Sequence, residues 1–360
     1  TIDNLAITEW VQRGASVYGK ETCDSLGRVR ISDDGNTVVV GMTNYTPETG
    51  DSVLDDQGNC TGNNIGGLRV LDWNGSAWTQ RGNDFLGNNS VDIVSGRRDL
   101  MFGYARGISK DNNTIIIGGF RFGDEEVRVW DWDSDNKIWK QRGLSIKPEI
   151  LGTLTHGREV SISDDGNTIL VSTPRGDEFK GYIRVFDWND SAWVQRGDKI
   201  VGKVGDNQDG DNLGTSAQLS SDANSIVLGA RFNSDGLPMA GAVYVYDWNG
   251  STWVQRGIGI YGQEENEILG AYHGAVDIND TRNTIVIGST ENEEGNGRIR
   301  VFDWNDSAWV QRGSNIDGDI DGHYMGYYVS LSNDGNTISS AVRVTGKTTA
   351  RVYDWNGSAW

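Results

Sequence analysis

The chain has 360 residues and a formal net charge of −19, with 49 Gly, 14 Trp and only 4 Pro. A negative field of this size repels nucleic acids and anionic membrane surfaces, so we expect neither as a partner. No apolar run approaches the ~18 residues of a membrane-spanning helix, so we do not expect membrane insertion. Because the sequence opens on Thr1 and not on Met, we expect a mature or excised segment of a secreted chain.

A tryptophan-rich phrase recurs along the chain and divides it into six units. It is incomplete at the start, as TEWVQRG from Thr8 to Gly14, and full copies such as IRVFDWNDSAWVQRG follow at 183–197 and 299–313. Its second Trp falls at residues 10, 78, 139, 193, 253, 309 and 360, which gives units of 51 to 68 residues. A period in this range indicates one supersecondary unit that has been copied and stacked.

Each unit also contains a phrase that predicts a β-hairpin. It occurs first as VRISDDGNTVVVG at 29–41 and again at 106–118, 160–172, 217–229, 276–288 and 329–341. Alternating residues, a polar turn and a β-branched run are typical of two antiparallel strands.

The tryptophan phrase predicts a second hairpin in each unit. With Asn189–Asp190 as a two-residue turn, Phe186 would face Trp193. We expect the tryptophans to pack between neighbouring units, and a stacking platform for sugars is the alternative.

Four antiparallel strands per unit predict an all-β fold, a β-propeller of six four-stranded blades formed by residues 1–360. Seven blades, a part of a longer array and an open stack of sheets remain alternatives. Glu9–Gly14 resembles a lone fourth strand, and we expect it to pair with Ala350–Trp355 and to close the ring, which would cover an exposed edge. Ser358–Trp360 begins a fourth strand of its own and competes for the same place.

Glycine pairs carry a resemblance to a known family. They stand at the start of the first strand, as Leu26-Gly27, Phe102-Gly103, Leu213-Gly214 and Met325-Gly326. Others end the second strand, as Gly41-Met42, Gly118-Gly119, Gly229-Ala230 and Gly288-Ser289. This arrangement resembles the FG-GAP repeats of integrin α-type propellers. The whole phrase set is similar to the FG-GAP-like repeats of secreted proteins from marine bacteria and diatoms.

The resemblance raises the question of whether this chain binds calcium, because the integrin loops do. Aligning Asp165-Gly166 with the integrin loops leaves too few oxygen ligands, so we expect these turns to be structural. Asp317, Asp319 and Asp321 have the D-x-D-x-D-G spacing of a Ca²⁺ loop, but Met325 and Tyr328 stand where a further carboxylate is needed. The acidic segment 206–212 is incomplete in a similar way. A solvated acidic loop is the default interpretation of both segments, and we expect no other cofactor.

Catalytic motifs are absent from the sequence, and we predict no catalytic residues. His156, His273 and His323 precede the first strand in three units and could meet only at the ring centre, where three histidines can hold a metal. Their offsets from the strand differ, which disfavours such a site. No nucleophile elbow, HExxH or Cys-based zinc pattern occurs.

The topology predicts two faces with different contents. The turns within hairpins form one face, the turn face; the links between hairpins and between units form the other, the loop face. Cys23 and Cys60 fall on the loop face of the first unit, and in a secreted chain we expect them to form a disulfide.

Asn-x-Ser/Thr sequons are candidate glycosylation sites, although Asn-Gly-Ser is also favourable turn chemistry. Five lie in the turn of the tryptophan hairpin: Asn74, Asn189, Asn249, Asn305 and Asn356. Asn112 and Asn279 lie in or near the other turn, and the remaining sequons are at Asn44, Asn59 and Asn88.

We therefore expect a non-enzymatic, secreted or cell-surface repeat protein. It would be a structural or adhesive part of a surface, matrix or appendage, and it could self-assemble. It would bind protein or glycan through the variable loop face, whose acidic segments should attract cations or a basic partner. The alternative is a glycan-processing enzyme on a propeller scaffold. That alternative needs a cluster of carboxylate, His, Tyr and Arg that lines the central funnel.

Overall fold

The computed structural model describes residues 11–19, 26–42, 53–54, 60–61, 66–87, 102–119, 126–150, 153, 155–204, 210–272, 274–291, 295–319, 324–344 and 347–360. Within these ranges the chain is all-β and contains no helix. Accordingly, no described segment is a helix of the length and apolarity that a membrane crossing requires.

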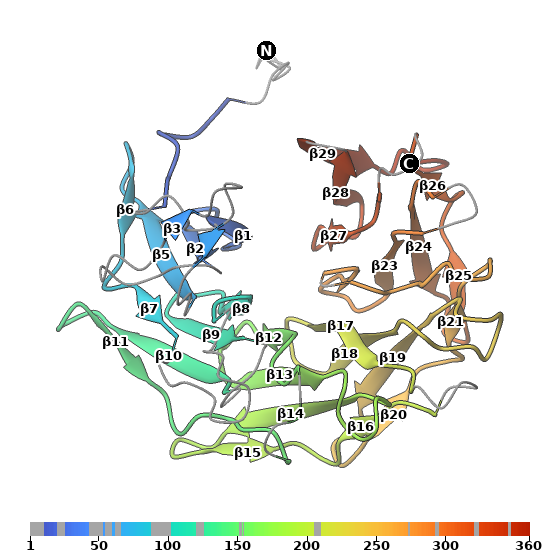
Figure 1. Cartoon of the computed structure of the whole chain (residues 1–360), viewed down its shortest axis with the longest axis horizontal. Helices are drawn as coiled ribbons and strands as arrows, with labels where there is room; N and C mark the ends of the chain where they lie inside the picture. The colour runs from blue at the N-terminus through green and yellow to red at the C-terminus, as the bar shows by residue number, and fades with distance from the viewer. Residues whose placement is uncertain are drawn as a thin grey trace.

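The strands form six antiparallel sheets, the blades, which succeed one another around a common axis (Figure 1). Blade 1 contains β1 (Leu26–Ile31), β2 (Thr37–Met42), β5 (Gly67–Trp73), β6 (Trp78–Gln80) and β7 (Phe85–Leu86). Blade 2 contains β8 (Ala105–Ile108), β9 (Thr114–Gly118), β10 (Arg128–Asp133) and β11 (Ile138–Gln141). Blade 3 contains β12 (Val160–Ile162), β13 (Thr168–Thr173), β14 (Tyr182–Trp188), β15 (Trp193–Gln195) and β16 (Ile200–Val201).

The second half of the chain repeats this plan. Blade 4 contains β17 (Leu213–Leu219), β18 (Ser225–Ala230), β19 (Ala242–Trp248), β20 (Trp253–Gln255) and β21 (Ile260–Tyr261). Blade 5 contains β22 (Val276–Ile278), β23 (Thr284–Ser289), β24 (Arg298–Trp304), β25 (Trp309–Gln311) and β26 (Ile316–Asp317). Blade 6 contains β27 (Tyr328–Leu331), β28 (Thr337–Val344) and β29 (Lys347–Asp354). The short strands β3 (Val53–Leu54) and β4 (Cys60–Thr61) pair with each other in the link between β2 and β5.

Within a blade, the order of the strands in the sheet follows their order in the chain. A short strand after the fourth, such as β16, pairs with the start of the third, so the outer edge of the blade is built from two pieces. The predicted propeller of six four-stranded blades is therefore confirmed, with three strands described in blade 6.

The predicted register of the tryptophan hairpin was wrong by two residues. Trp188 faces Trp193, and Phe186 faces Gln195. The side chain of Asn189 accepts hydrogen bonds from the backbone N–H groups of Ser191 and Ala192, at 3.1 and 2.9 Å. This Asx turn stabilises a four-residue connection in place of the expected two-residue turn.

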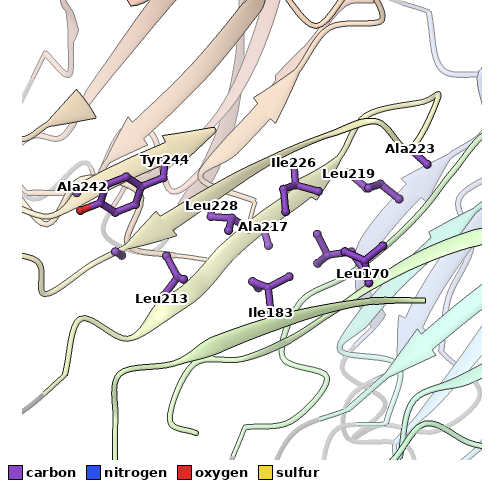
Figure 2. Close-up of a cluster of buried hydrophobic side chains, with 12 residues drawn as sticks. Leu170, Ile183, Leu213, Ala217, Leu219, Ala223, Ile226, Leu228, Ala242 and Tyr244 are labelled. Carbon is purple, nitrogen blue, oxygen red and sulfur yellow. The ribbon is translucent and has the colours of Figure 1, made fainter. Parts of the chain in front are cut away.

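The hydrophobic core is divided among the interfaces between consecutive blades. Figure 2 shows the cluster between blades 3 and 4, where Leu170 and Ile183 lie against Leu213, Leu219 and other apolar side chains of the next blade. Four further clusters join blades 1 and 2, 2 and 3, 4 and 5, and 5 and 6. Each inner blade, from the second to the fifth, thus buries its two faces on its neighbours, as expected for a stacked repeat.

The Gln-Arg-Gly ending of each fourth strand forms a clasp on the following blade. Arg196 holds Asp187 of its own blade through Nε and Nη2, both at 2.7 Å, and Nη1 donates to the Ala223 carbonyl of blade 4 at 2.6 Å. The Arg196 carbonyl accepts a hydrogen bond from Trp253 Nε1 at 3.2 Å. Gly197 lies against the ring of Trp248. The tryptophans therefore pack between units, as expected.

The clasp recurs at every described blade. The arginines are Arg13, Arg81, Arg142, Arg196, Arg256 and Arg312. Their carbonyl acceptors are Gly35, Asn112, Gly166, Ala223, Arg282 and Gly335. All six acceptor residues have positive φ, between 59 and 73°, which turns their carbonyls toward the preceding blade.

Arg13 brings the N-terminal segment onto blade 1, where it donates to the Gly35 carbonyl at 2.7 Å. The described residues 11–14 form no ladder with β29, and Trp360 packs on Trp355 where a fourth-strand tryptophan belongs. Glu9 and Trp10 lie outside the described residues. In the described part of the chain, the N-terminal segment therefore contacts blade 1, as a fourth strand of blade 6 would. It does not form the predicted pairing with β29 of blade 6.

The first and last blades each leave one face uncovered. Val29 and Ile31 of β1 are 58% and 56% exposed, whereas Val160, at the position of Val29 in blade 3, is 5% exposed. On β29, Val352 is 50% exposed, whereas the equivalent Val185 is 2% exposed. We call these two surfaces the end faces. No buried cluster of described residues joins blade 6 to blade 1.

Candidate functional site

Charged and aromatic residues gather where the first strands begin. β1, β8, β12, β17 and β27 line the centre of the propeller in Figure 1, and β22 contacts β17 and β27. In four blades a glycine stands at or just before the start of the first strand. The residue directly after this glycine is Arg28 in blade 1, Tyr104 in blade 2, Arg158 in blade 3 and Tyr327 in blade 6. Arg106, Glu159, Tyr272 and Tyr328 lie in or next to the first strands of their blades. Arg175 and Arg231 follow the second strands of blades 3 and 4. We call these ten residues the axial cluster; all lie on the loop face.

Arginine and tyrosine side chains link four blades within the axial cluster. The Arg28 guanidinium lies 3.2 Å from the centre of the Tyr104 ring and 5.8 Å from that of Tyr328. Tyr272 stacks on Tyr327 with centroids 4.8 Å apart, and Tyr328 meets Tyr327 edge-on at 4.9 Å. Such contacts are favourable because the ring faces are electron-rich. Blades 1, 2, 5 and 6 therefore meet at the axis.

Glu159 is the carboxyl group inside this cluster. Burial raises the pKa of Glu159 to about 8, while Arg28, Arg158 and Arg106 act in the opposite direction. The backbone amide of Gly274, in blade 5, hydrogen bonds the same carboxyl group. Because the pKa of Glu159 is raised, this carboxyl group is partly protonated at neutral pH and compensates the arginine charges only in part.

Three arginines of the cluster, Arg158 and Arg175 of blade 3 and Arg231 of blade 4, act on one another electrostatically, and we call them the arginine triad. Burial lowers the pKa of Arg158 and of Arg231, and repulsion among the three guanidinium groups lowers it further. Arg231 Nε is buried without a hydrogen-bond partner among the described residues. In a chain of net charge −19, this is a local positive site.

A pocket of about 530 Å³ lies on the loop face, and Arg175 is the one member of the triad in its lining. It is lined by Ile150, Thr153, Arg175, Asp177, Glu178, Phe179 and Lys180. Three consecutive residues of this wall, Asp177, Glu178 and Phe179, have φ between 49 and 66°. Non-glycine residues rarely adopt this left-handed conformation, and such strain clusters at binding sites. Here it leaves the Phe179 ring half-exposed at the rim.

The arrangement suits an anion better than a metal ion. Guanidinium groups donate to carboxylate or sulfate oxygens in a fixed geometry. Among the residues that the structure describes, no group of three or more His, Cys, Asp or Glu side chains could hold a metal.

The candidate calcium residues have cationic partners. Asp317 accepts from Arg298 at 2.5 Å, and Asp319 pairs with Arg351. Asp321 lies outside the described residues. The Asp165-Gly166 turn is held by internal hydrogen bonds: Asp165 accepts from Ser163 Oγ at 2.6 Å and from the Asn167 amide at 2.9 Å.

Other acidic loop residues are also engaged. Asp211 accepts from the Lys203 amide at 3.0 Å, Glu264 pairs with Arg298 at 2.7 Å, and Glu267 pairs with Arg300 at 3.2 Å. Asp206 and Asp209 lie outside the described residues. These pairs reduce the negative field that the loop face would otherwise present.

His156 has a structural position. It is fully buried, with Nδ1 2.9 Å from Thr173 Oγ1 and Nε2 3.2 Å from the Ile146 carbonyl. Both ring nitrogens are therefore occupied. His273 and His323 lie outside the described residues.

The sequons differ in accessibility. Asn74, Asn189, Asn249, Asn305 and Asn356 are exposed on the turn face. Asn279 does not fit the glycosylation prediction, because it is 4% exposed and its Nδ2 donates to Thr281 at 2.9 Å. Asn112 is half-buried, and its Nδ2 lies 3.3 Å from Asp34.

The remaining covalent predictions lie outside the described residues. Asn44, Asn59 and Asn88 are among them, as is Cys23, the expected disulfide partner of Cys60.

Sequence reasoning missed the axial cluster. The signal was present in the position that directly follows the repeated glycine, where Arg28, Tyr104, Arg158 and Tyr327 break an otherwise regular pattern. Residues that depart from a repeat at a strand end are free of its packing role.

No protein-family model and no curated protein matches the chain. Solved structures share its fold at low identity. A functionally unknown protein from Desulfotomaculum acetoxidans aligns at 11% identity and a TM-score of 0.56, over 92% of this chain and 83% of its own. The β-propeller domain of Cps50 (Swd1) from Myceliophteria thermophila aligns at 8% identity and a TM-score of 0.55, over 94% and 85%. TolB from Acinetobacter baumannii aligns at 12% identity and a TM-score of 0.49, over 91% of this chain and 63% of its own. The likeness to the first two structures shows the β-propeller fold alone.

Proposed function

We propose that this chain is a non-enzymatic extracellular repeat protein, a structural or adhesive component that binds its partner through the loop face. One observation carries the proposal: the turn face is the same clasp and Asx turn in blade after blade, whereas the loop face holds the non-repeated charges, rings and pocket. Surfaces that are free of packing roles can be specialised for binding.

An orientation experiment tests this function. A biotin acceptor tag is inserted beside Asp135 on the turn face or beside Leu237 on the loop face, both in exposed connections that tolerate insertion. Beads that carry the protein by its turn face should adhere to polysaccharide- or protein-coated surfaces, and beads that carry it by its loop face should not. Equal adhesion in the two orientations, or none in either, would contradict the proposal.

The FG-GAP-like kinship remains part of the proposal. What supports it is the meeting of the two glycine positions across blades. A Cβ on Gly41, at the end of β2, would lie 2.4 Å from the Gly103 carbonyl, and one on Gly288 would lie 2.1 Å from that of Gly326. Only glycine fits such an approach, which gives the paired motifs a physical reason.

Extracellular location is tested through covalent marks. We expect glycans at the exposed Asn74, Asn189, Asn249, Asn305 and Asn356 if the source is a eukaryote, and a bridge between Cys23 and Cys60. Glycopeptide mass and non-reducing peptide maps of native material would show both. Bare asparagines in eukaryotic material and free thiols would argue against secretion.

A glycan-processing enzyme is the second candidate. It is favoured by the carboxyl group of Glu159 among arginines and tyrosines at the axis, the kind of cluster that this alternative requires. Most glycosidases use two carboxyl groups, and the axial cluster contributes one, so we place binding first. Release of reducing ends from oligosaccharides, and its loss in Glu159→Gln, would reverse that order.

A further inference from the structure

We propose that the pocket around Phe179 on the loop face binds a neutral saccharide, one sugar ring of which stacks on the Phe179 side chain. This inference rests on the proposed function and names the chemical class of its ligand. One wall of the pocket belongs to the link between β13 and β14, and the other is formed by Ile150 and Thr153, which precede β12.

The Phe179 ring is not part of the packed core. It is 46% exposed and belongs to none of the five buried clusters of described residues. Exposed apolar side chains are common on protein surfaces, so exposure alone does not identify a site. Phe179 differs from a scattered surface residue because it lines a pocket of about 530 Å³, a volume typical of small-molecule sites.

The backbone presents this ring in an unfavourable conformation. Phe179 has a φ of +66° and directly follows Asp177 at +49° and Glu178 at +59°. Glycine adopts this left-handed conformation without the steric penalty of a Cβ, so an aromatic residue is the less stable choice here. Because the ring adds little packing in return, we attribute the retained strain to ligand binding.

Hydrogen bonds and ion pairs hold the pocket in one shape. The Phe179 carbonyl accepts hydrogen bonds from the backbone N–H and from Nδ2 of Asn212, both at 3.0 Å. Lys199 Nζ pairs with Asp177 at 2.9 Å and with Glu149, the residue before the opposite wall, at 2.6 Å. Lys199 therefore ties the two walls together. A site that is ordered in advance loses little conformational entropy when its ligand binds.

The polar groups of the pocket favour a neutral ligand. Two cationic side chains and two carboxylates line it, so its formal charge is zero: Arg175, Lys180, Asp177 and Glu178. The hydroxyl groups of a sugar both donate and accept hydrogen bonds, and therefore suit cationic donors and carboxylate acceptors alike. The exposed Arg175 can donate to such hydroxyl groups, while the C–H face of the sugar packs on the Phe179 ring.

Calorimetric titration of the folded chain tests the site. Cellohexaose, laminarihexaose and mannohexaose are the neutral probes, and an oligogalacturonate is the acidic one. We expect at least one neutral probe to bind, with an affinity that does not change as salt is raised. Binding of the oligogalacturonate alone would overturn the proposal.

Phe179→Gly should weaken binding of the neutral probe about tenfold or more, which corresponds to about 1.4 kcal/mol. Phe179→Tyr keeps the flat ring and should retain binding. Because glycine relieves the strained φ, the thermal midpoint of Phe179→Gly should be no lower than that of the wild type. A lower midpoint would show that the ring supports the fold, and it would overturn the site, as would unchanged affinity in Phe179→Gly.

Tyr324→Gly is the matched control. Tyr324 is also an aromatic residue of the loop face, with a φ of +46° and 41% exposure, and it does not line the pocket. This variant should leave the affinity unchanged, and equal weakening in the two glycine variants would contradict the site. If beads that carry the protein by its turn face adhere to protein-coated surfaces while no neutral probe binds, the proposed function survives and this inference does not. Probe binding without adhesion in either orientation would contradict the proposed function and leave the saccharide site.

Discussion

Gly197 shows how little room the clasp leaves for a side chain. Its φ is +67°, and a Cβ there would lie 2.7 Å from Trp248 Cζ3. Gly250 also has positive φ, +96°, but a Cβ there would meet nothing within 4 Å. Comparing the two positions therefore separates backbone strain from overpacking.

We expect Gly197→Ala to lower the free energy of unfolding by about 1–3 kcal/mol more than Gly250→Ala does. Equilibrium urea unfolding of both variants would measure the difference. Equal losses would mean that the tryptophan ring moves aside without cost.

The buried imidazole of His156 makes stability depend on pH. Burial lowers the pKa of His156 to about 3. The unfolded chain takes up a proton on this residue below about pH 6.5, whereas the folded chain does so only near pH 3. The histidine therefore contributes stability above pH 6.5 that is lost as the pH falls from 6.5 to 3.

His156→Gln should remove this part of the acid sensitivity. We expect the thermal midpoint to fall less between pH 7 and pH 4 in the variant than in the wild type, even though the variant is less stable at pH 7. Parallel curves for the two proteins would show that carboxylates alone cause the acid loss.

At the scale of elements, the clasp depends on the geometry of an arginine. Arg196 reaches Asp187, the Ala223 carbonyl and Thr168 Oγ1 at once, the last at 3.1 Å. Lysine keeps the charge but lacks the planar fork that reaches several acceptors. We expect Arg196→Ala to cost about 1–3 kcal/mol of unfolding free energy, and Arg196→Lys to recover less than half of it.

Chemical unfolding of the two variants tests this expectation, with Arg282→Gln as a control that removes a guanidinium group but keeps the backbone carbonyl that accepts from Arg256. Full recovery by lysine would show that only the charge matters.

The sequence predicted the strands of the blades better than it predicted the turn geometry and the axial cluster. The hairpins followed from the period and from turn residues; both formed as expected in blades 1 to 5, whereas blade 6 has three described strands and lacks the second hairpin. The register of the tryptophan hairpin did not follow from them, because the bonds from the Asn189 side chain to Ser191 and Ala192 decide the loop length. The axial cluster needs contacts between residues such as Arg28 and Tyr328, far apart in the chain. Local pattern cannot supply such contacts.

For the whole molecule, the end faces predict self-association. Val29 and Ile31 on one end and Val352 on the other are apolar and exposed, although their counterparts in other blades are buried. The two faces correspond in sequence to the faces that meet at the internal interfaces, so we expect a second copy to dock on them head to tail. We expect the sedimentation coefficient to rise with protein concentration.

The paired change Val29→Lys and Ile31→Lys should abolish this association without lowering the thermal midpoint, since both side chains are exposed. Val254→Lys, at another exposed valine away from the end faces, is the control. A monomer at all concentrations, or association that persists in the double variant, would contradict the prediction.

Because each clasp joins only one blade to the next, the molecule should behave under tension as a chain of links in series. A pulling force applied to the two ends would load every link equally, and the weakest would open first and release one blade at a time. Each release would lengthen the tether by about 180–240 Å, the contour length of one unit of 51 to 68 residues. Blades that refold between pulls would let the molecule absorb repeated strain and recover its length.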